Sequence, residues 1–293
     1  MTRSKATMIG FSAVLLWSLL ALLTIGSAPV PPLLLNAMCF GIGGSLGLIW
    51  TLVTGRLSLL KTVSWRVYAF GTLGLFGYHL LYFTAFRLGP DATTGLIAYL
   101  WPLFIVLLSG LLPDERLTRA HVLGAVLALS GAGIIVLGAG TGGGANLPAL
   151  GLAFLCAVTW ASYSVLSRRL GSVPTESVTV FCLATALLSG LAHLGWETTQ
   201  WPQGGLGWVA ILALGLGPVG LAFFTWDIGM KKGDIQLLGV ASYAAPLLST
   251  LALVAAGIAH PSVSLLAAAL LITGGAAIAA RASAKSSKPL KDG

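Results

Sequence analysis

Charged residues are scarce in this chain: they make up 8% of its 293 residues, whereas hydrophobic residues make up 57%. With a mean hydropathy of +0.94, the chain has too little polar surface to cover a soluble globule of this length. The 16 Lys and Arg outnumber the 8 Asp and Glu. They fall in short loops and a tail and form no stripe beside base-stacking aromatics, which excludes nucleic-acid binding. The sequence therefore predicts a polytopic membrane protein.

Cysteine is rare and nucleotide-binding motifs are missing. The three cysteines, Cys39, Cys156 and Cys182, fall in apolar segments and are odd in number, which argues against a disulfide framework or a metal site. No Gly-x-x-x-x-Gly-Lys loop is present, so the chain does not hydrolyse ATP by that route, and we expect no cofactor. No apolar segment carries an acidic pair, so facilitated movement is at least as well supported as proton antiport.

Ten apolar segments are each close to the ~20 residues needed to cross ~30 Å of hydrocarbon. We expect spans at about 7–25, 32–54, 66–87, 92–112, 119–139, 148–168, 175–195, 206–229, 235–257 and 262–281. Short connections between them leave no room for a soluble domain.

Basic residues set the expected orientation, because loops rich in Lys and Arg stay in the cytoplasm. Of the 16 Lys and Arg, all but Arg87 fall on one side of the ten spans. Both termini are therefore expected in the cytoplasm, at a bacterial-type inner membrane. Arg3 and Lys5 ahead of an apolar run also fit a signal peptide, but removing that helix would break the charge alternation of every later loop.

The chain repeats itself with a period of about 144 residues. The matching pairs are Trp17-Ser18 with Trp160-Ala161, Tyr82-Phe83-Thr84 with Phe223-Phe224-Thr225, Gly89 with Gly233, and Tyr99-x-x-Pro102 with Tyr243-x-x-Pro246. We expect the first repeat over 1–143, the second over 144–284 and a basic cytoplasmic tail over 285–293. Five helices in each half make the second copy enter the membrane from the opposite face. The predicted fold is all-α, with ten transmembrane helices as two inverted five-helix repeats around a central cavity, a common transporter plan.

His79 lies near the middle of the third predicted span, beside Tyr78. Tyr82, Phe83 and Phe86 follow it at helical spacing. Polar groups at that depth face the bundle interior or water, so Tyr78, His79 and Tyr82 are candidate substrate-binding residues. His79 would hydrogen-bond an ammonium or carboxylate group of the substrate. The alternative is a His bonded to a neighbouring helix.

The fourth predicted span contains Tyr99, Trp101 and Pro102. An internal proline frees a carbonyl and kinks a helix, which would turn Tyr99 and Trp101 toward one space. Pro246 is expected to act in the same way on Tyr243. Alternatively, Trp101 simply packs between helices.

Further aromatic residues are expected to approach the same centre if the first helices of the two halves face each other. They are Trp17, Trp160, Tyr163, Phe223 and Phe224. Aromatic walls suit flat apolar substrates, and they hold desolvated cations with roughly 2 kcal/mol or more of cation–π attraction. By contrast, the remaining tryptophans near predicted interfaces are expected to be belt residues: Trp50, Trp65, Trp196, Trp201 and Trp208.

Two charges are candidates for coupling or gating. Asp227 lies near the cytoplasmic end of the eighth span, four residues before Lys231. A salt-bridged or solvated helix end is favoured over a proton or substrate role. Arg87 lies four residues before Asp91, and it either pairs locally, snorkels to the outer surface or contributes to an outer gate.

Several motifs together carry a family resemblance that covers nearly the whole chain. They are Trp17-Ser18, the Tyr-Phe-Thr-Ala-Phe stretch from Tyr82, Trp101-Pro102-Leu103 and the Asp114-Glu115-Arg116-Leu117 turn. The chain resembles the drug/metabolite transporter superfamily, within it the EamA-type exporters, and most closely the YddG-type exporters of aromatic amino acids and paraquat. Ala259-His260-Pro261 stands where a second acidic turn would be, so the two gates are not expected to be equivalent.

This resemblance implies export, and the predicted inverted repeat favours a transporter over an intramembrane enzyme or an assembly partner. An enzyme needs a nucleophile, base or metal set at one depth, which His79 and nearby tyrosines do not supply. We expect a transporter that carries amino acids, preferentially aromatic ones, or another small metabolite of the superfamily. Ten helices in two halves suffice for a monomer, and the lipid bilayer is the other expected partner.

Overall fold

The computed structural model describes residues 1–89, 92–138, 146–257 and 260–286, which form helices and turns without any strand. The helices are α1 (Arg3–Trp17), α2 (Leu20–Gly26), α3 (Pro32–Val53), α4 (Leu57–Lys61), α5 (Trp65–Leu88), α6 (Ala92–Ala98), α7 (Trp101–Ser109), α8 (Arg119–Gly138), α9 (Leu147–Arg169), α10 (Ser177–Trp196), α11 (Gly204–Leu216), the π-helical turn η1 (Gly217–Leu221), α12 (Ala222–Lys232), α13 (Ile235–Ala241), α14 (Ala244–Ala255) and α15 (Val263–Ser286). The predicted all-α class is confirmed.

Nine helical segments of the described residues are long and apolar enough to cross a membrane. They are Arg3–Gly26, Pro32–Val53, Trp65–Leu88, Arg119–Leu137, Leu147–Arg169, Ser177–Trp196, Gly204–Lys232, Ile235–Ala255 and Val263–Lys285. The fourth predicted span, 92–112, differs, because its apolar helix covers only Thr94–Ser109 and is interrupted.

Prolines explain where two of the predicted spans are interrupted. A proline has no N–H, and its ring clashes with the carbonyl four residues earlier. Accordingly, α6 ends at Ala98 and α7 begins at Trp101, directly before Pro102. In the same way, α13 ends at Ala241 and α14 begins at Ala244, ahead of Pro246. The two interruptions therefore fall at corresponding positions of the sequence repeat.

The first and eighth predicted spans also deviate from straight helices. The first breaks between α1 and α2 at Ser18, directly after Trp17. The eighth contains the π-helical turn η1, which includes Pro218. A π turn widens the helix by one residue and rotates everything that follows, so it alters which side chains of α12 face the bundle centre.

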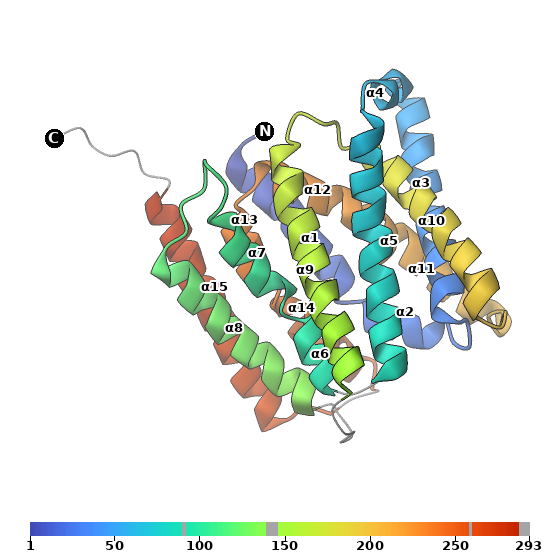
Figure 1. The fold of residues 1–293 in the computed structure, drawn as a ribbon. Coiled ribbons are helices and arrows are strands. Elements are labelled where there is room, and N and C mark those ends of the chain that lie inside the picture. Colours follow the sequence, from blue (N-terminus) through green and yellow to red (C-terminus); the bar gives the residue numbers. More distant parts are fainter. Residues whose placement is uncertain (90–91, 139–145, 258–259, 287–293) are drawn as a thin grey trace.

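Helices from the two halves of the chain pack against each other. α8 contacts α15 and α3 contacts α10; α1 packs on α12 as α5 packs on α9. Figure 1 shows the α8 and α15 pair along one edge of the bundle and the α3 and α10 pair along the other. Glycines allow the α8–α15 approach: a Cβ on Gly275 would lie 2.4 Å from the Gly124 carbonyl oxygen.

The five predicted belt tryptophans are all exposed, the least being Trp208 at 49%. This fits side chains that meet the membrane interface instead of the core. Three other expectations lie outside the described residues: the boundary at 143 and 144, the tail from 287 onward, and Ala259 of the non-acidic turn. The first residues of the predicted tail, Lys285 and Ser286, belong to α15.

Candidate functional site

Trp17, the last residue of α1, lies at the centre of a cluster of large aromatic side chains. Its ring centroid is 5.0 Å from Trp226, 5.9 Å from Trp160, 6.1 Å from Phe223 and 6.2 Å from Trp101. We call these five residues the aromatic cluster. They come from α1, α7, α9 and α12, so both halves of the chain contribute. The structure thus brings together Trp17, Trp101 and Trp160, as expected.

The cluster is held by polar contacts at its edges. Trp17 Nε1 donates a 3.0 Å hydrogen bond to the Pro218 carbonyl in the π-helical turn. Trp226 Nε1 donates to Ser164 Oγ at 3.1 Å. Buried indole N–H groups need such partners, and each bond fixes the plane of its ring. Trp226 was not predicted, although its position three residues after Phe223 places both on one helical face.

His79 on α5 borders the aromatic cluster. Its ring lies 6.1 Å from Phe223 and stands edge-on to Phe40 at 5.0 Å. Nδ1 is 2.7 Å from the Leu75 carbonyl oxygen of its own helix. Because a carbonyl only accepts, Nδ1 is the donor, and in a neutral ring Nε2 is left as an acceptor. His79 is therefore bonded within α5 and does not make the predicted alternative bond to a neighbouring helix through Nδ1.

Tyrosines extend the aromatic surface along α5 and α9. Tyr78 lies 5.2 Å from Trp160 and 6.0 Å from Tyr82, and Tyr82 lies 4.6 Å from Phe86. The Tyr163 ring of α9 is also 5.3 Å from Trp160. The predicted residues Tyr78, Tyr82 and Tyr163 thus form a continuous aromatic surface with the cluster.

Two of the predicted residues, Phe224 and Tyr243, lie apart from this surface. Phe224 is turned toward α3, because a Cβ on Gly47 would lie 2.5 Å from its Cζ atom; its neighbour Phe223 is the one in the cluster. Tyr99 lies half-buried on the turn between α6 and α7. Tyr243 is fully buried, and its hydroxyl oxygen accepts the Leu103 N–H at 3.0 Å. The structure therefore separates Tyr243 and Phe224 from the aromatic cluster.

Asp227 makes a buried ion pair and is not a solvated helix end. Its carboxylate is 2.9 Å from Lys231 Nζ and accepts a 2.7 Å hydrogen bond from the Thr175 hydroxyl. Both side chains of the pair are at most 3% exposed. Each charge is thus satisfied by a local partner, as the favoured salt-bridge interpretation predicts.

Glu115 connects four parts of the chain at the end of the bundle expected to be cytoplasmic. Its side chain, 2% exposed, pairs with Arg3 at 2.9 Å and with Arg168. Arg168 Nη1 also donates to the Gly233 carbonyl at 2.7 Å, and Arg3 lies 3.5 Å from Asp234. We call Glu115, Arg3, Arg168 and Asp234 the Glu115 network. The family motif contains Glu115, but local sequence spacing does not indicate its partners Arg3 and Arg168.

Arg87, in the last turn of α5, belongs to a second network. It pairs with Glu197, whose side chain is 1% exposed and also bonds His193 Nδ1 at 2.9 Å. The same carboxylate accepts the N–H groups of Leu33 and Leu34 at the start of α3. We call Arg87, His193 and Glu197 the Glu197 network. Asp91, the expected local partner, lies outside the described residues, and Glu197 was not predicted.

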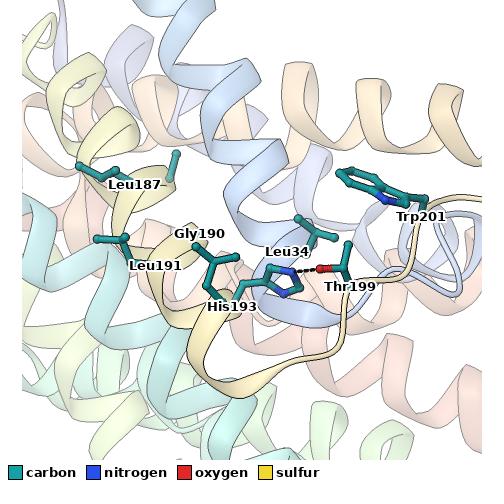
Figure 2. A pocket seen from close by; sticks show the side chains of 9 residues that line it. Leu34, Leu187, Gly190, Leu191, His193, Thr199 and Trp201 are labelled. Atoms are coloured by element: carbon teal, nitrogen blue, oxygen red, sulfur yellow. Dashed lines mark hydrogen bonds between the residues drawn. The ribbon is translucent and has the colours of Figure 1, made fainter.

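A groove of about 460 Å³ lies between α3 and α10. Figure 2 shows Leu187, Leu191 and Gly190 along α10, with His193 bonded to Thr199 and Trp201 opposite them. Its leucines Leu187 and Leu191 are exposed on a membrane-spanning helix, where they meet lipid. The groove is thus separate from the aromatic cluster.

A bundle of apolar helices long enough to cross a membrane defines a polytopic membrane protein. Comparison with known proteins gives the family. The model of the EamA-like transporter family matches residues 4–137 and again 147–281. The chain therefore belongs to the EamA-like transporter family, as a multi-pass inner-membrane transporter and not an enzyme. The two matches also mean that the family unit occurs twice.

Related proteins cover nearly the whole chain. The aromatic amino acid exporter YddG of Ancylobacter novellus is 55% identical over 284 residues, 95% of this chain and 98% of that protein. The aromatic amino acid exporter YddG of Escherichia coli is 29% identical over 94% of this chain and 96% of its own. A solved crystal structure with 53% identity covers 97% of this chain and 100% of its own, with a TM-score of 0.92. The predicted resemblance is confirmed.

Proposed function

We propose that this transporter exports aromatic amino acids across the inner membrane by alternating access, without coupling to an ion gradient. The observation that carries the proposal is the aromatic cluster, in which Trp17 contacts Trp160, Phe223 and Trp226 of the other half and Trp101 contacts Trp160 and Trp226. The names of the Ancylobacter novellus and Escherichia coli relatives support the substrate class.

The transport cycle rests on a ten-helix, inverted-repeat architecture. The interrupted helix over Thr94–Ser109 is the tenth crossing in this proposal. Each repeat, 1–143 and 144–284, then holds five crossings, and the second enters from the opposite face. The two matches to the family and the reciprocal packing of α1 on α12 and α5 on α9 support this arrangement. Both termini are cytoplasmic, and a monomer is the working unit.

Substrate recognition follows from the chemistry of the cluster. The side chain of an aromatic amino acid packs against Trp101, Trp160 and Tyr78, as offset and edge-on ring pairs favour. The acceptor nitrogen of His79, Nε2, accepts a hydrogen bond from the substrate's ammonium group. Flat organic cations fit the same walls through cation–π attraction. Tyr99, half-buried beside the break, completes the polar side of the site.

Each of the two charged networks closes one end of the pathway, and both are formed in this structure. The Glu115 network ties the first half to Arg168 and Asp234 of the second half. The Glu197 network ties Arg87 of the first half to α10 at the other end. Opening one end requires separating the pairs at that end. Because Asp227 is already neutralised by Lys231, the cycle needs no bound proton at that carboxylate.

The test is transport by the purified protein in liposomes. Uptake and efflux of radiolabelled phenylalanine, tryptophan and a small aliphatic amino acid are measured with and without a pH gradient. We expect preference for the aromatic substrates, no response to the gradient, and loss of transport in Trp101→Ala and His79→Ala. Trp208→Ala, at an exposed belt position, is the control that stays active. Movement of no amino acid would overturn the substrate class and favour another metabolite, and movement only with the gradient would overturn the uncoupled cycle.

A further inference from the structure

Tyr243 makes a hydrogen bond that joins the helix breaks of the two halves. It lies on the turn between α13 and α14, and its hydroxyl oxygen accepts the Leu103 N–H at 3.0 Å. Leu103 is the third residue of α7, the half-helix that begins at Trp101 after the other break. The side chain of Tyr243 is fully buried, so water does not compete for this bond.

The bonded N–H is one that the helix cannot satisfy by itself. The first N–H groups of any helix lack partners within it, and within a membrane no water is available to replace them. Pro102 has no N–H, and the Phe104 N–H already bonds the Leu100 carbonyl at 3.0 Å. The Tyr243 hydroxyl therefore holds the start of α7, and with it Trp101 of the aromatic cluster.

The sequence repeat contains a second copy of the same elements. Tyr99-x-x-Pro102-Leu103 corresponds to Tyr243-x-x-Pro246-Leu247, 144 positions later. The two tyrosines nevertheless differ in this structure: Tyr243 is fully buried, whereas Tyr99 is half-buried. Repeats of an alternating transporter exchange their conformations during the cycle. An interaction made by one repeat in one state is then made by the other repeat in the opposite state.

We propose that Tyr243 and Tyr99 are a pair of alternating positioning residues. In the conformation of this structure, the Tyr243 hydroxyl holds the Leu103 N–H and fixes the start of α7. In the opposite conformation, Tyr243 releases Leu103 and the Tyr99 hydroxyl holds the Leu247 N–H in α14. This inference rests on the proposed alternating-access cycle. It assigns Tyr243 to conformational control and removes it from the surface that touches substrate.

The test measures the populations of the two conformations by distances between spin labels. One pair of labels is placed at Lys5 and Ser172, near the Glu115 network, and a second pair at Leu88 and Thr198, near the Glu197 network; all four are exposed. The native cysteines Cys39, Cys156 and Cys182 are first replaced by alanine. New cysteines are then introduced at the four positions, and the labels are attached to them. The full-length protein is measured in liposomes, and export of phenylalanine is measured on the same preparations.

We expect Tyr243→Phe and Tyr99→Phe to shift the populations in opposite directions. Tyr243→Phe lowers the ratio of the conformation seen here to the opposite one by about three- to tenfold, the effect of losing one hydrogen bond between membrane helices. Tyr99→Phe raises that ratio by a similar factor, and the double variant returns toward the unmodified ratio. Tyr68→Phe, which loses a 2.6 Å bond to the Leu60 carbonyl away from both breaks, leaves the ratio unchanged.

If both variants shift the population ratio in the same direction, or neither shifts it, the proposal is overturned. A purely structural role of the two tyrosines would not make their variants shift the ratio in opposite directions. If Tyr243→Phe does not fold, Tyr99→Phe decides alone: a raised ratio supports the proposal and any other result overturns it. If the unmodified protein exports phenylalanine but both pairs of labels show only one distance, alternating access itself is overturned. This result needs no tyrosine variant, so a failure of alternating access is distinguishable from a failure of the tyrosine proposal.

Discussion

Trp17 and Pro218 are joined across the two halves of the chain, because the indole Nε1 donates a 3.0 Å hydrogen bond to the proline carbonyl. The acceptor lies in the π-helical turn η1 of the second half, and a carbonyl oxygen has two lone pairs with which it can accept this bond. The donor ends α1 and lies at the centre of the aromatic cluster. A distortion in one half thus sets the orientation of the central ring contributed by the other.

Removing only the indole donor is expected to slow transport. Trp17→Phe keeps an aromatic ring but leaves the Pro218 carbonyl without its partner, and such bonds between membrane helices change an equilibrium by about three- to tenfold. The initial rate of phenylalanine export from liposomes should fall by about that factor. Trp17→Ala, which also removes the ring, should reduce it further. Equal rates for Trp17→Phe and the unmodified protein would mean that the ring alone matters.

Breaking the Glu115 network is expected to destabilise the fold. Glu115→Gln leaves Arg168, only 17% exposed in its side chain, without its carboxylate partner, and removing one partner of a buried pair costs about 3–5 kcal/mol. Thermal unfolding in detergent should show a Tm lowered by several degrees. The matched control is Glu176→Gln, whose partner Arg56 is 58% exposed; a surface pair is worth about 0–1 kcal/mol. Equal Tm changes for both variants would contradict this account.

The Asp227–Lys231 pair gives a prediction about compensation. Asp227→Asn leaves the buried Lys231 ammonium without a counter-charge and should lower the Tm, since an unpaired buried charge is costly. Asp227→Asn combined with Lys231→Met removes both charges and should restore most of the loss. Export by the double variant should still ignore a pH gradient. Abolished export in a double variant of normal Tm would instead assign Asp227 a role in transport.

The contact of α8 with α15 gives a prediction with two adjacent glycines. A Cβ on Gly275 would lie 2.4 Å from the Gly124 carbonyl oxygen, whereas a Cβ on Gly274 meets nothing within 4 Å. Gly275→Ala forces the helices apart, and overpacking costs about 1–3 kcal/mol. Gly274→Ala should leave the Tm unchanged or slightly raised. The two melting curves in detergent check this directly, and a lower Tm for Gly274→Ala would show that helix spacing is not the cause.

Much of the site was predictable because it follows from periodicity and from the repeat. His79, Tyr82 and Phe86 lie at helical spacing, and Trp17 matches Trp160 in the repeat, so their approach to one centre could be expected. The breaks before Pro102 and Pro246 were predictable as kinks, because proline chemistry is local. Helix ends were harder: the short helix over Thr94–Ser109 looks like a full span when only hydropathy is considered.

The errors have physical causes that local patterns do not show. The choice between Phe223 and Phe224 depends on helical phase, and the π-helical turn before α12 rotates that phase. Trp226 lies beside Asp227 near the expected end of a span, where hydropathy gives no sign that a side chain faces the bundle centre. Glu115 and Glu197 each bind partners more than 50 positions away in the chain, such as Arg168 and Arg87. Contacts at that separation have no signature in local spacing.

In the proposed cycle, the bonds of Glu197 bear on which helices separate at this end of the bundle. Its carboxylate accepts the Leu33 and Leu34 N–H groups of α3 and bonds the imidazole of His193 in α10, and Leu33 and His193 are buried. Its third partner, Arg87 of α5, is 43% exposed. The attachment to α5 is therefore the one that runs through the most exposed partner. In the proposed cycle, α3 and α10, which pack on each other, would therefore move as one rigid body and separate from α5.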